Sequence, residues 1–114
     1  MANDMDLSRA EEVEAFIART PLAQELGIRC EVMGDEMTAI LPFQEKLIGN
    51  VSIRALHGGA IAAFLELTAQ AQVFLVTEHL THPPRPINLT IDYLRQGHAK
   101  ETYARASITK MGRR

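Results

Sequence analysis

The chain has 114 residues, of which 12 are basic and 14 acidic, giving a formal net charge of −2. This length fits one domain spanning 1–114, and 46% apolar with 23% charged content excludes a disordered chain. The single cysteine, Cys30, excludes an intramolecular disulfide framework and cysteine-based zinc sites. The acidic, polar start MANDMDLSRAEEVE resembles neither a signal peptide nor a mitochondrial presequence, so we expect a cytoplasmic protein.

Positive charge gathers in the last twenty residues, where Glu101 is the only acid. Such a stretch fits either a polyanion-binding surface or a pair of solvated strands. A nucleic-acid partner is not expected, because the whole chain is mildly acidic and aromatic residues do not alternate with the basic residues. The six bases are Arg95, Lys100, Arg105, Lys110, Arg113 and Arg114.

The N-terminal part predicts one helix and a hairpin. Residues 8–19, SRAEEVEAFIAR, open with serine followed three residues later by glutamate, a capping-box pattern, and continue with apolar residues at helical spacing. Thr20-Pro21 ends this helix, because the residue before a proline is pushed out of the helical region. Residues 28–33 and 36–42 alternate as strands around a Gly34-Asp35 turn.

An irregular connection over 43–57 leads to the most apolar stretch of the chain, which predicts a helix over about 58–78. Thirteen of the residues in 60–77 are apolar. We reject a transmembrane helix, because Glu66 and polar neighbours lie at its middle and no basic flank precedes it. A helix apolar around most of its girth is instead a core helix.

The C-terminal part predicts two further strands. The proline-rich residues 82–86 mark a loop, after which 87–95 and 101–111 both alternate between apolar and polar side chains. The order of elements predicts an α+β domain in which an antiparallel sheet curls around one helix.

His57, Gly58 and Gly59 lead directly into the predicted core helix. The free N–H groups at a helix N-terminus carry partial positive charge, so they can stabilise a carbonyl oxygen that becomes negative during a reaction. The alternative is a glycine turn that only lets the chain enter the helix.

Glu66 is the only ionisable side chain between Gly58 and Thr77, and no base lies three or four positions away. A carboxylate that loses its hydration on an apolar helix without an ion-pair partner is a candidate nucleophile or general base. The alternative is that Glu66 emerges at the edge of the core and is solvated there.

The spacing of these groups predicts a dimer. Gly58 and Glu66 are eight positions apart, about 12 Å along a helix axis, so one subunit's pair cannot easily serve one reacting atom. Two antiparallel copies of the helix would set Glu66 of one subunit beside Gly58 of the other, in a two-fold dimer with shared sites.

These residues carry a family resemblance. The run LIGNVSIRALHGGAIAAFLEL resembles the signature of hotdog-fold acyl-CoA thioesterases of the phenylacetic-acid-pathway type, and INLTIDYLR and ITKMGRR resemble downstream segments of that family. The resemblance implies a long helix wrapped by an antiparallel sheet, homodimers or dimers of dimers, and hydrolysis of a CoA thioester. It implies no metal or redox cofactor and no membrane, and it predicts that the chain ends before the last strand or strands of the fold.

The resemblance also implies roles for individual residues. Glu66 would be the catalytic carboxylate, as nucleophile or general base, although the family more often has aspartate there. The Gly58 N–H would polarise the thioester carbonyl, His57 would fix the turn or bind near the substrate, and Asn50 would orient water or substrate. Groups expected to bind the substrate or its CoA phosphates are Gly59, Arg95, Lys110, Gly112, Arg113 and Arg114. Two alternatives stay open: a non-catalytic acyl-CoA sensor, and a hotdog dehydratase or hydratase.

Overall fold

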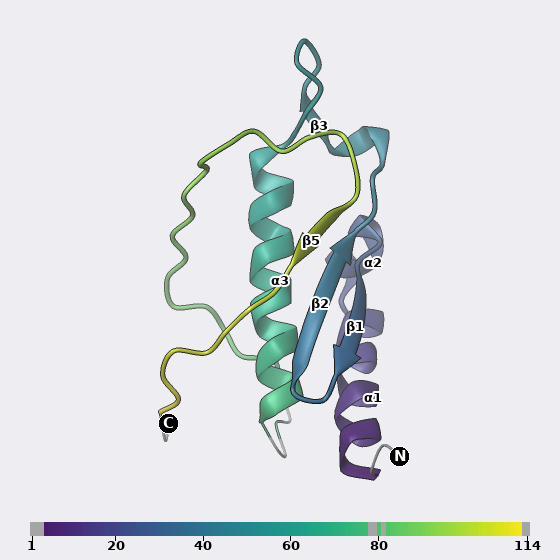
Figure 1. Ribbon diagram of the computed structural model, residues 1–114, viewed down its shortest axis with the longest axis vertical. Coiled ribbons are helices and arrows are strands. Elements are labelled where there is room, and N and C mark those ends of the chain that lie inside the picture. The colour runs from purple at the N-terminus through teal and green to yellow at the C-terminus, as the bar shows by residue number, and fades with distance from the viewer. Residues whose placement is uncertain (1–3, 78–79, 81, 113–114) are drawn as a thin grey trace.

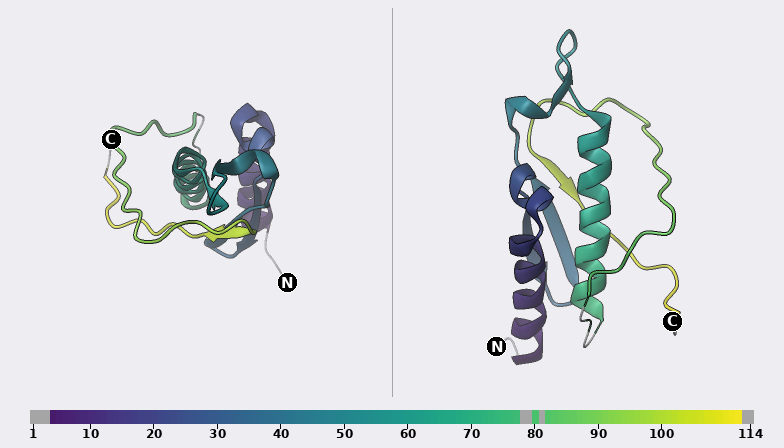
Figure 2. Two further views of the ribbon diagram at one scale, coloured as in Figure 1. Left: turned by 90° about the horizontal axis from the view of Figure 1, so that it is seen from above. Right: turned by 180° about the vertical axis from the view of Figure 1, so that it is seen from behind.

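The computed structural model describes residues 4–77, 80 and 82–112. Strands β1, β2 and β5 form an antiparallel sheet in that order, and β3 pairs with β4. Helix α1 and the larger sheet lie on one side of α3, and the segment 82–95 passes along the other side (Figures 1 and 2). The elements are α1 (Asp4–Arg19), α2 (Pro21–Leu26), β1 (Arg29–Met33), β2 (Glu36–Leu41), the 3₁₀ helix η1 (Glu45–Leu47), β3 (Ile48–Asn50), β4 (Ala55–Leu56), α3 (Gly58–Val76) and β5 (Thr102–Ala104).

The predicted N-terminal helix is confirmed and begins four residues earlier than expected, at Asp4. It ends before Thr20-Pro21 as predicted, but the chain then forms the short helix α2, which the sequence analysis missed. Proline suits the first position of a helix, because its missing N–H has no partner there in any case. Helix α1 packs on α3 through Phe16 and Phe74, whose ring centroids lie 5.0 Å apart.

The predicted hairpin and the position of its turn are confirmed. Met33 pairs with Glu36, which leaves Gly34-Asp35 as the two-residue turn. Gly34 has a φ of 64°, in the left-handed region that glycine adopts without steric cost. The face of β1 that carries Cys30 and Val32 packs against the core, whereas its other residues are exposed.

Helix α3 is the core helix of the fold. By length and composition alone it could cross a membrane, with a mean hydropathy of 1.5. Its buried residues, which include Phe64, Leu67 and Leu75, instead form one hydrophobic cluster with residues of α1 and β2. The helix ends at Val76, two residues before the predicted end at position 78, which lies outside the described residues.

Truncation of a core side chain tests this arrangement. Phe64 is 1% exposed, so we expect Phe64→Ala to lower the free energy of unfolding by about 3–5 kcal/mol, through lost burial and the cavity left behind. Urea denaturation followed by circular dichroism measures the change. Leu65→Ala is the matched control, because Leu65 is 37% exposed on the same helix, and we expect it to cost far less. Equal losses in the two variants would contradict this description of the core.

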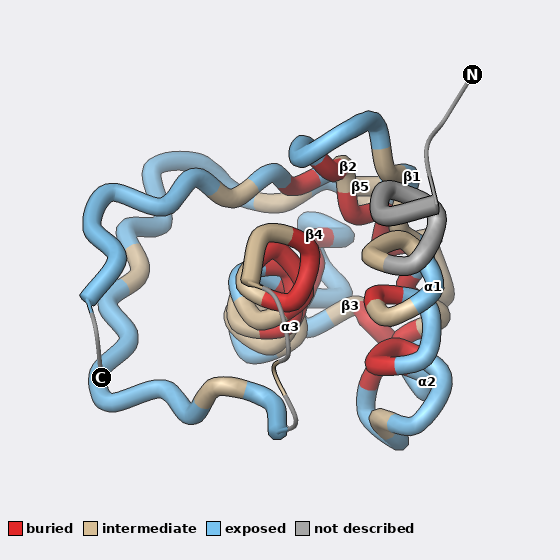
Figure 3. Tube along the Cα trace, turned by 90° about the horizontal axis from the view of Figure 1, so that it is seen from below, coloured by how far each residue is buried: buried red, intermediate tan, exposed pale blue. Residues whose placement is uncertain are grey.

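The predicted strand over 87–95 is wrong as an element of this structure. Residues 87–95 form no strand, and Ile87, Leu89, Tyr93 and Leu94 are all exposed (Figure 3). A strand exists only where a neighbouring strand pairs with its backbone, and among the described residues none lies beside this segment. The alternating pattern was therefore present without the partner that turns it into a strand.

The predicted strand over 101–111 is correct only over β5. Thr102 pairs with Leu41, and Ala104 pairs with Ala39. Beyond Ala104 the backbone ladder stops, and the Arg105 side chain donates a hydrogen bond to the Thr38 hydroxyl at 2.9 Å. Strand β5 pairs with β2 alone, and this pairing includes only three residues of the segment 101–111.

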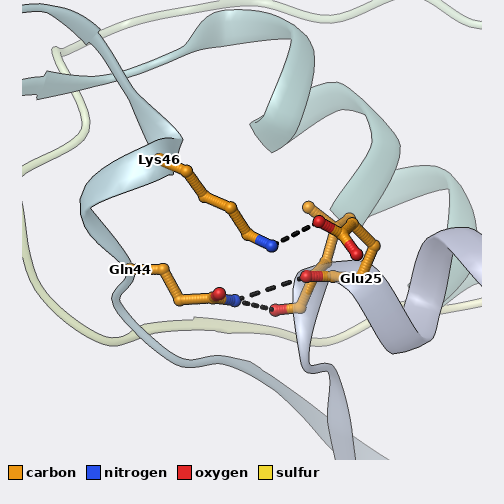
Figure 4. Close-up of polar contacts among 4 residues, drawn as sticks. Glu25, Gln44 and Lys46 are labelled. Carbon is orange, nitrogen blue, oxygen red and sulfur yellow. Dashed lines mark hydrogen bonds and ion pairs between the residues drawn. The ribbon is translucent and has the colours of Figure 1, made fainter.

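The connection after β2 is fixed to the end of α2 (Figure 4). The Gln44 side-chain amide donates to the Leu26 carbonyl at 3.2 Å and to the Glu25 carbonyl at 3.4 Å. Lys46 forms an ion pair with Glu25, and this hydrogen-bonded cation lowers the pKa of the Glu25 carboxyl. These contacts position η1, whose last residue contacts the start of α3.

Candidate active site

The start of α3 leaves one backbone donor available. His57 has an extended backbone (φ −62°, ψ 128°) and caps the helix, because its Nδ1 accepts a hydrogen bond from the Gly59 N–H at 2.8 Å. The Ala60 and Ile61 N–H groups both donate to the His57 carbonyl, at 3.0 and 3.2 Å. Among the described residues, no group accepts a hydrogen bond from the Gly58 N–H. This N–H is the free donor at the positive end of the helix dipole.

Two other segments hold this turn in place. The His57 N–H donates to the Leu47 carbonyl at 2.7 Å, and the Leu56 N–H donates to the Gly97 carbonyl at 2.9 Å. Strand β3 also runs close beside the turn, since a Cβ added to Gly49 would lie 2.7 Å from the Cα of His57. The glycine before Asn50 is therefore required by close backbone approach, and the turn is fixed from both sides.

Glu66 lies two turns further along α3 and is half-buried. Its carboxylate forms no hydrogen bond or ion pair with any other described residue. It lies eight positions after Gly58, about 12 Å along the axis. Within one protomer the two groups therefore face different points in space, as the sequence spacing predicts.

A pocket of about 230 Å³ adjoins Glu66 on the side of α3 away from the sheet. Gln70, one turn after Glu66, donates a hydrogen bond to the Pro84 carbonyl at 2.8 Å. This bond attaches residues 82–95, here called the crossing segment, to the helix. The walls are mostly apolar. They comprise Glu66, Ala69, Gln70 and Val73 of α3 together with Pro84, Arg85, Pro86, Asn88 and Leu89 of the crossing segment.

Asn50 and Gly59 have local partners. The Asn50 side-chain oxygen accepts hydrogen bonds from the Ser52 N–H at 3.1 Å and the Ile53 N–H at 3.4 Å, which shapes the tip of the β3–β4 hairpin. The Gly59 N–H is held by His57, so it is not available to a ligand in this conformation. The roles inferred for Asn50 and Gly59 stay predictions.

Arg95 and Lys110, the two described basic residues expected to bind CoA, lie toward opposite ends of α3. Arg95 is exposed and follows Tyr93, which contacts Gly58 at the start of α3. Lys110 and Gly112 are exposed and flank Met111, which lines a pocket with Val76 at the other end of α3. Arg113 and Arg114 lie outside the described residues. Gly58 and Val76, the first and last residues of α3, are 18 positions apart, about 27 Å along the axis.

The sequence analysis missed two contributors to this site. Tyr93, which lies in the segment 87–95 predicted there as a strand, donates a hydrogen bond from its hydroxyl to the Gly58 carbonyl at 2.8 Å. No sequence signal indicated this contact, because Tyr93 is exposed and an exposed hydroxyl can bond to water. Gln70 could have been found from its position, since residues i and i+4 share one face of a helix.

Cys30 is half-buried, and burial together with the nearby Glu14 raises the pKa of its thiol to about 11. A thiol with this pKa stays protonated near neutral pH and is a poor nucleophile. Cys30 therefore contributes packing rather than chemistry.

A long apolar helix packed against an antiparallel sheet, with a glycine turn at its start, defines a hotdog-type thioesterase domain, and the hotdog fold predicted from the sequence is confirmed. The chain belongs to the thioesterase superfamily, whose sequence model matches residues 54–114. Comparison with curated protein sequences found no match.

Three solved structures illustrate the relationship. A thioesterase-superfamily protein is 25% identical, with a TM-score of 0.83 over 94% of this chain and 80% of its own. A thioesterase family protein from Silicibacter pomeroyi is 22% identical, with a TM-score of 0.76 over 92% and 76%. A phenylacetic acid degradation-related protein from Ralstonia eutropha JMP134 is 17% identical, with a TM-score of 0.73 over 90% and 80%. The last two similarities concern the fold alone. Membership of the superfamily indicates thioester hydrolase activity.

Proposed function

We propose that this protein is an acyl-CoA thioesterase that hydrolyses a CoA thioester to the free acid and CoA, with no resident metal or cofactor. The observation that carries the proposal is that α3 presents both a Gly58 N–H and a half-buried Glu66 carboxylate, neither of which has a hydrogen-bond or ion-pair partner among the described residues. A backbone donor stabilises the oxyanion that forms as the thioester carbonyl is attacked, and the carboxylate supplies or activates the attacking oxygen.

Glu66 has two chemically consistent roles. As a general base it takes a proton from water, the hydroxide attacks the carbonyl carbon, and the carbon–sulfur bond breaks as the proton passes to the CoA sulfur. As a nucleophile it attacks the carbonyl itself, expels CoA and forms an anhydride that water then hydrolyses. Both roles require the oxyanion donor on the same carbonyl.

The distance along α3 supports a homodimer with shared sites, and a dimer of dimers remains part of the proposal. In an antiparallel pair of α3 helices, Glu66 of one subunit approaches Gly58 of the other. The same arrangement brings Arg95 of one subunit toward Lys110 and Gly112 of the other, because these groups lie at opposite ends of α3. A shared site would therefore shorten the separation of these basic groups along α3 from about 27 Å to about 15 Å, because Val76 of one subunit lies ten positions beyond its Glu66 and so beyond Gly58 of the other. Both groups suit binding of the CoA phosphates.

The pocket beside Glu66 is proposed to take the acyl group. Its walls on α3 extend from Glu66 to Val73, seven positions or about 10 Å, and its lining is mostly apolar. These dimensions fit an aryl or medium-chain acyl group whose carbonyl lies near Glu66.

Free-thiol release from a panel of acetyl-, hexanoyl-, phenylacetyl- and 4-hydroxybenzoyl-CoA tests the proposal directly. Release above the uncatalysed rate supports a thioesterase. No release from any thioester, together with tight acyl-CoA binding by calorimetry, would overturn the enzyme and favour an acyl-CoA sensor.

The same panel tests the acyl pocket. Ala69 is exposed and lines the pocket, so Ala69→Phe should fill it without disturbing the core. We expect kcat/KM for phenylacetyl-CoA to fall roughly tenfold or more relative to acetyl-CoA. Ala15→Phe, at an exposed position of α1, is the control and should leave the ratio unchanged. An unchanged ratio in Ala69→Phe would place the acyl group elsewhere.

A further inference from the structure

Tyr93 connects the crossing segment to the Gly58–Gly59 peptide, which directly follows the free Gly58 N–H at the start of α3. Its hydroxyl donates to the Gly58 carbonyl at 2.8 Å. Its ring lies against the same residue, since a Cβ added to Gly58 would be 3.4 Å from the ring. This is the only hydrogen bond recorded for the side chains of 87–95 within the described part of the chain. An otherwise exposed segment is therefore anchored at the candidate oxyanion site.

The Gly58–Gly59 peptide is held at both of its polar atoms. Its carbonyl accepts from Tyr93, and its N–H, which belongs to Gly59, donates to His57 Nδ1 at 2.8 Å. The preceding peptide carries the free Gly58 N–H, and the two peptides share the Cα of Gly58. Glycine has no side chain to restrict rotation about that Cα, so the direction of the Gly58 N–H depends on hydrogen bonds to both peptides. The first peptide is held at the His57 carbonyl, which accepts from the Ala60 and Ile61 N–H groups, and the second is held at the Gly58 carbonyl by Tyr93.

We propose that Tyr93 is a positioning residue: by holding the Gly58 carbonyl, it fixes the direction of the Gly58 N–H toward the substrate carbonyl. This inference rests on the proposed function, since the donor matters only where an oxyanion forms. Oxyanion stabilisation requires a donor that is already oriented before the reaction, because reorientation during the reaction would cost the energy that the contact supplies. The Tyr93 hydroxyl bonds to the Gly58 carbonyl and not to the Gly58 N–H that would meet the substrate.

Tyr93→Phe is the test, because it removes the hydroxyl and keeps the ring against Gly58. We expect kcat for the best thioester to fall about five- to tenfold, the effect of losing one neutral hydrogen bond, with KM unchanged. In ¹⁵N-labelled protein, the Gly59 amide resonance should move, and hydrogen exchange at Gly59, whose N–H is bonded to His57, should accelerate. Gel filtration with light scattering establishes that the variant keeps the wild-type oligomeric state.

Tyr103→Phe is the matched control. The Tyr103 hydroxyl is bonded to Glu101 on the exposed surface of β5, so its loss should change neither kcat nor the glycine amides. Unchanged Gly59 resonance and exchange in Tyr93→Phe would overturn the proposal, as would altered amides with an unchanged kcat. If wild-type protein hydrolyses no thioester, the proposed function fails, and the amide measurements alone decide whether Tyr93 holds the peptide.

Discussion

Glu66→Gln should lower kcat for thioester hydrolysis by about 10²-fold or more, with a much smaller change in KM. Glutamine has nearly the shape of glutamate, so the packing of the half-buried side chain on α3 is preserved. Its neutral amide can neither accept a proton from water at neutral pH nor attack a thioester. The loss therefore falls on the chemical step, for either of the two roles proposed for this residue. Thiol release under saturating acyl-CoA measures it.

The control for Glu66→Gln is a variant that removes one carboxylate elsewhere on the surface. Glu11→Gln changes the net charge by the same amount at an exposed position of α1, far along the chain from α3, and we expect activity like that of the wild type. Equal thiol release from Glu66→Gln and wild-type protein would keep the thioesterase but remove Glu66 from its mechanism. A general loss of activity in both variants would indicate a charge effect on substrate binding instead.

Local chemistry explains which parts of the fold could be predicted. The Gly34-Asp35 turn and the start of α3 depend on neighbouring residues in the sequence, and both lie where the sequence placed them. Segment 87–95 has an equally regular pattern, but a strand requires a partner that its own residues do not specify. Periodicity alone predicts which face of a segment is apolar, and the surrounding chain decides whether that face becomes part of a sheet.

The candidate site shows the same division. The HGG turn and Glu66 stand out because glycines and a lone carboxylate are unusual on an apolar helix. Tyr93 did not stand out, because its contact with Gly58 joins residues 35 positions apart. Likewise, no spacing rule predicts the hydrogen bond from Gln70 to the Pro84 carbonyl. Both residues line the pocket beside Glu66. Residues that hold a site from a distant segment are found only after the chain has folded.

Gly58→Pro should lower kcat by about 10² to 10³-fold, because proline removes the backbone N–H proposed to bind the oxyanion. Position 58 is the first residue of α3, where proline is well tolerated, and His57 already has the extended backbone that a following proline requires. The variant should therefore fold, with the loss confined to catalysis. Thermal unfolding and kcat, measured on the same preparation, separate the two effects.

Gly58→Ala is the matched control, because alanine adds a side-chain carbon but keeps the N–H. The added Cβ would meet the Tyr93 ring at 3.4 Å, an ordinary van der Waals distance, so we expect most of the activity to remain. Equal losses in the alanine and proline variants would attribute the effect to crowding against Tyr93 rather than to the donor.

Mixing the two inactive variants tests whether the site is shared between subunits. If Glu66 of one subunit works with Gly58 of the other, a heterodimer of Glu66→Gln and Gly58→Pro subunits contains one site with both groups intact and one site with neither. Co-expression with two different affinity tags, followed by tandem purification, should therefore restore about half of the wild-type activity per dimer, as expected for one of two independent sites. If each subunit instead used its own Glu66 and Gly58, every site in the heterodimer would lack one group and activity would stay low. The 12 Å that separate the two groups along α3 favour restored activity, and its absence would overturn the two-fold arrangement without affecting the family assignment.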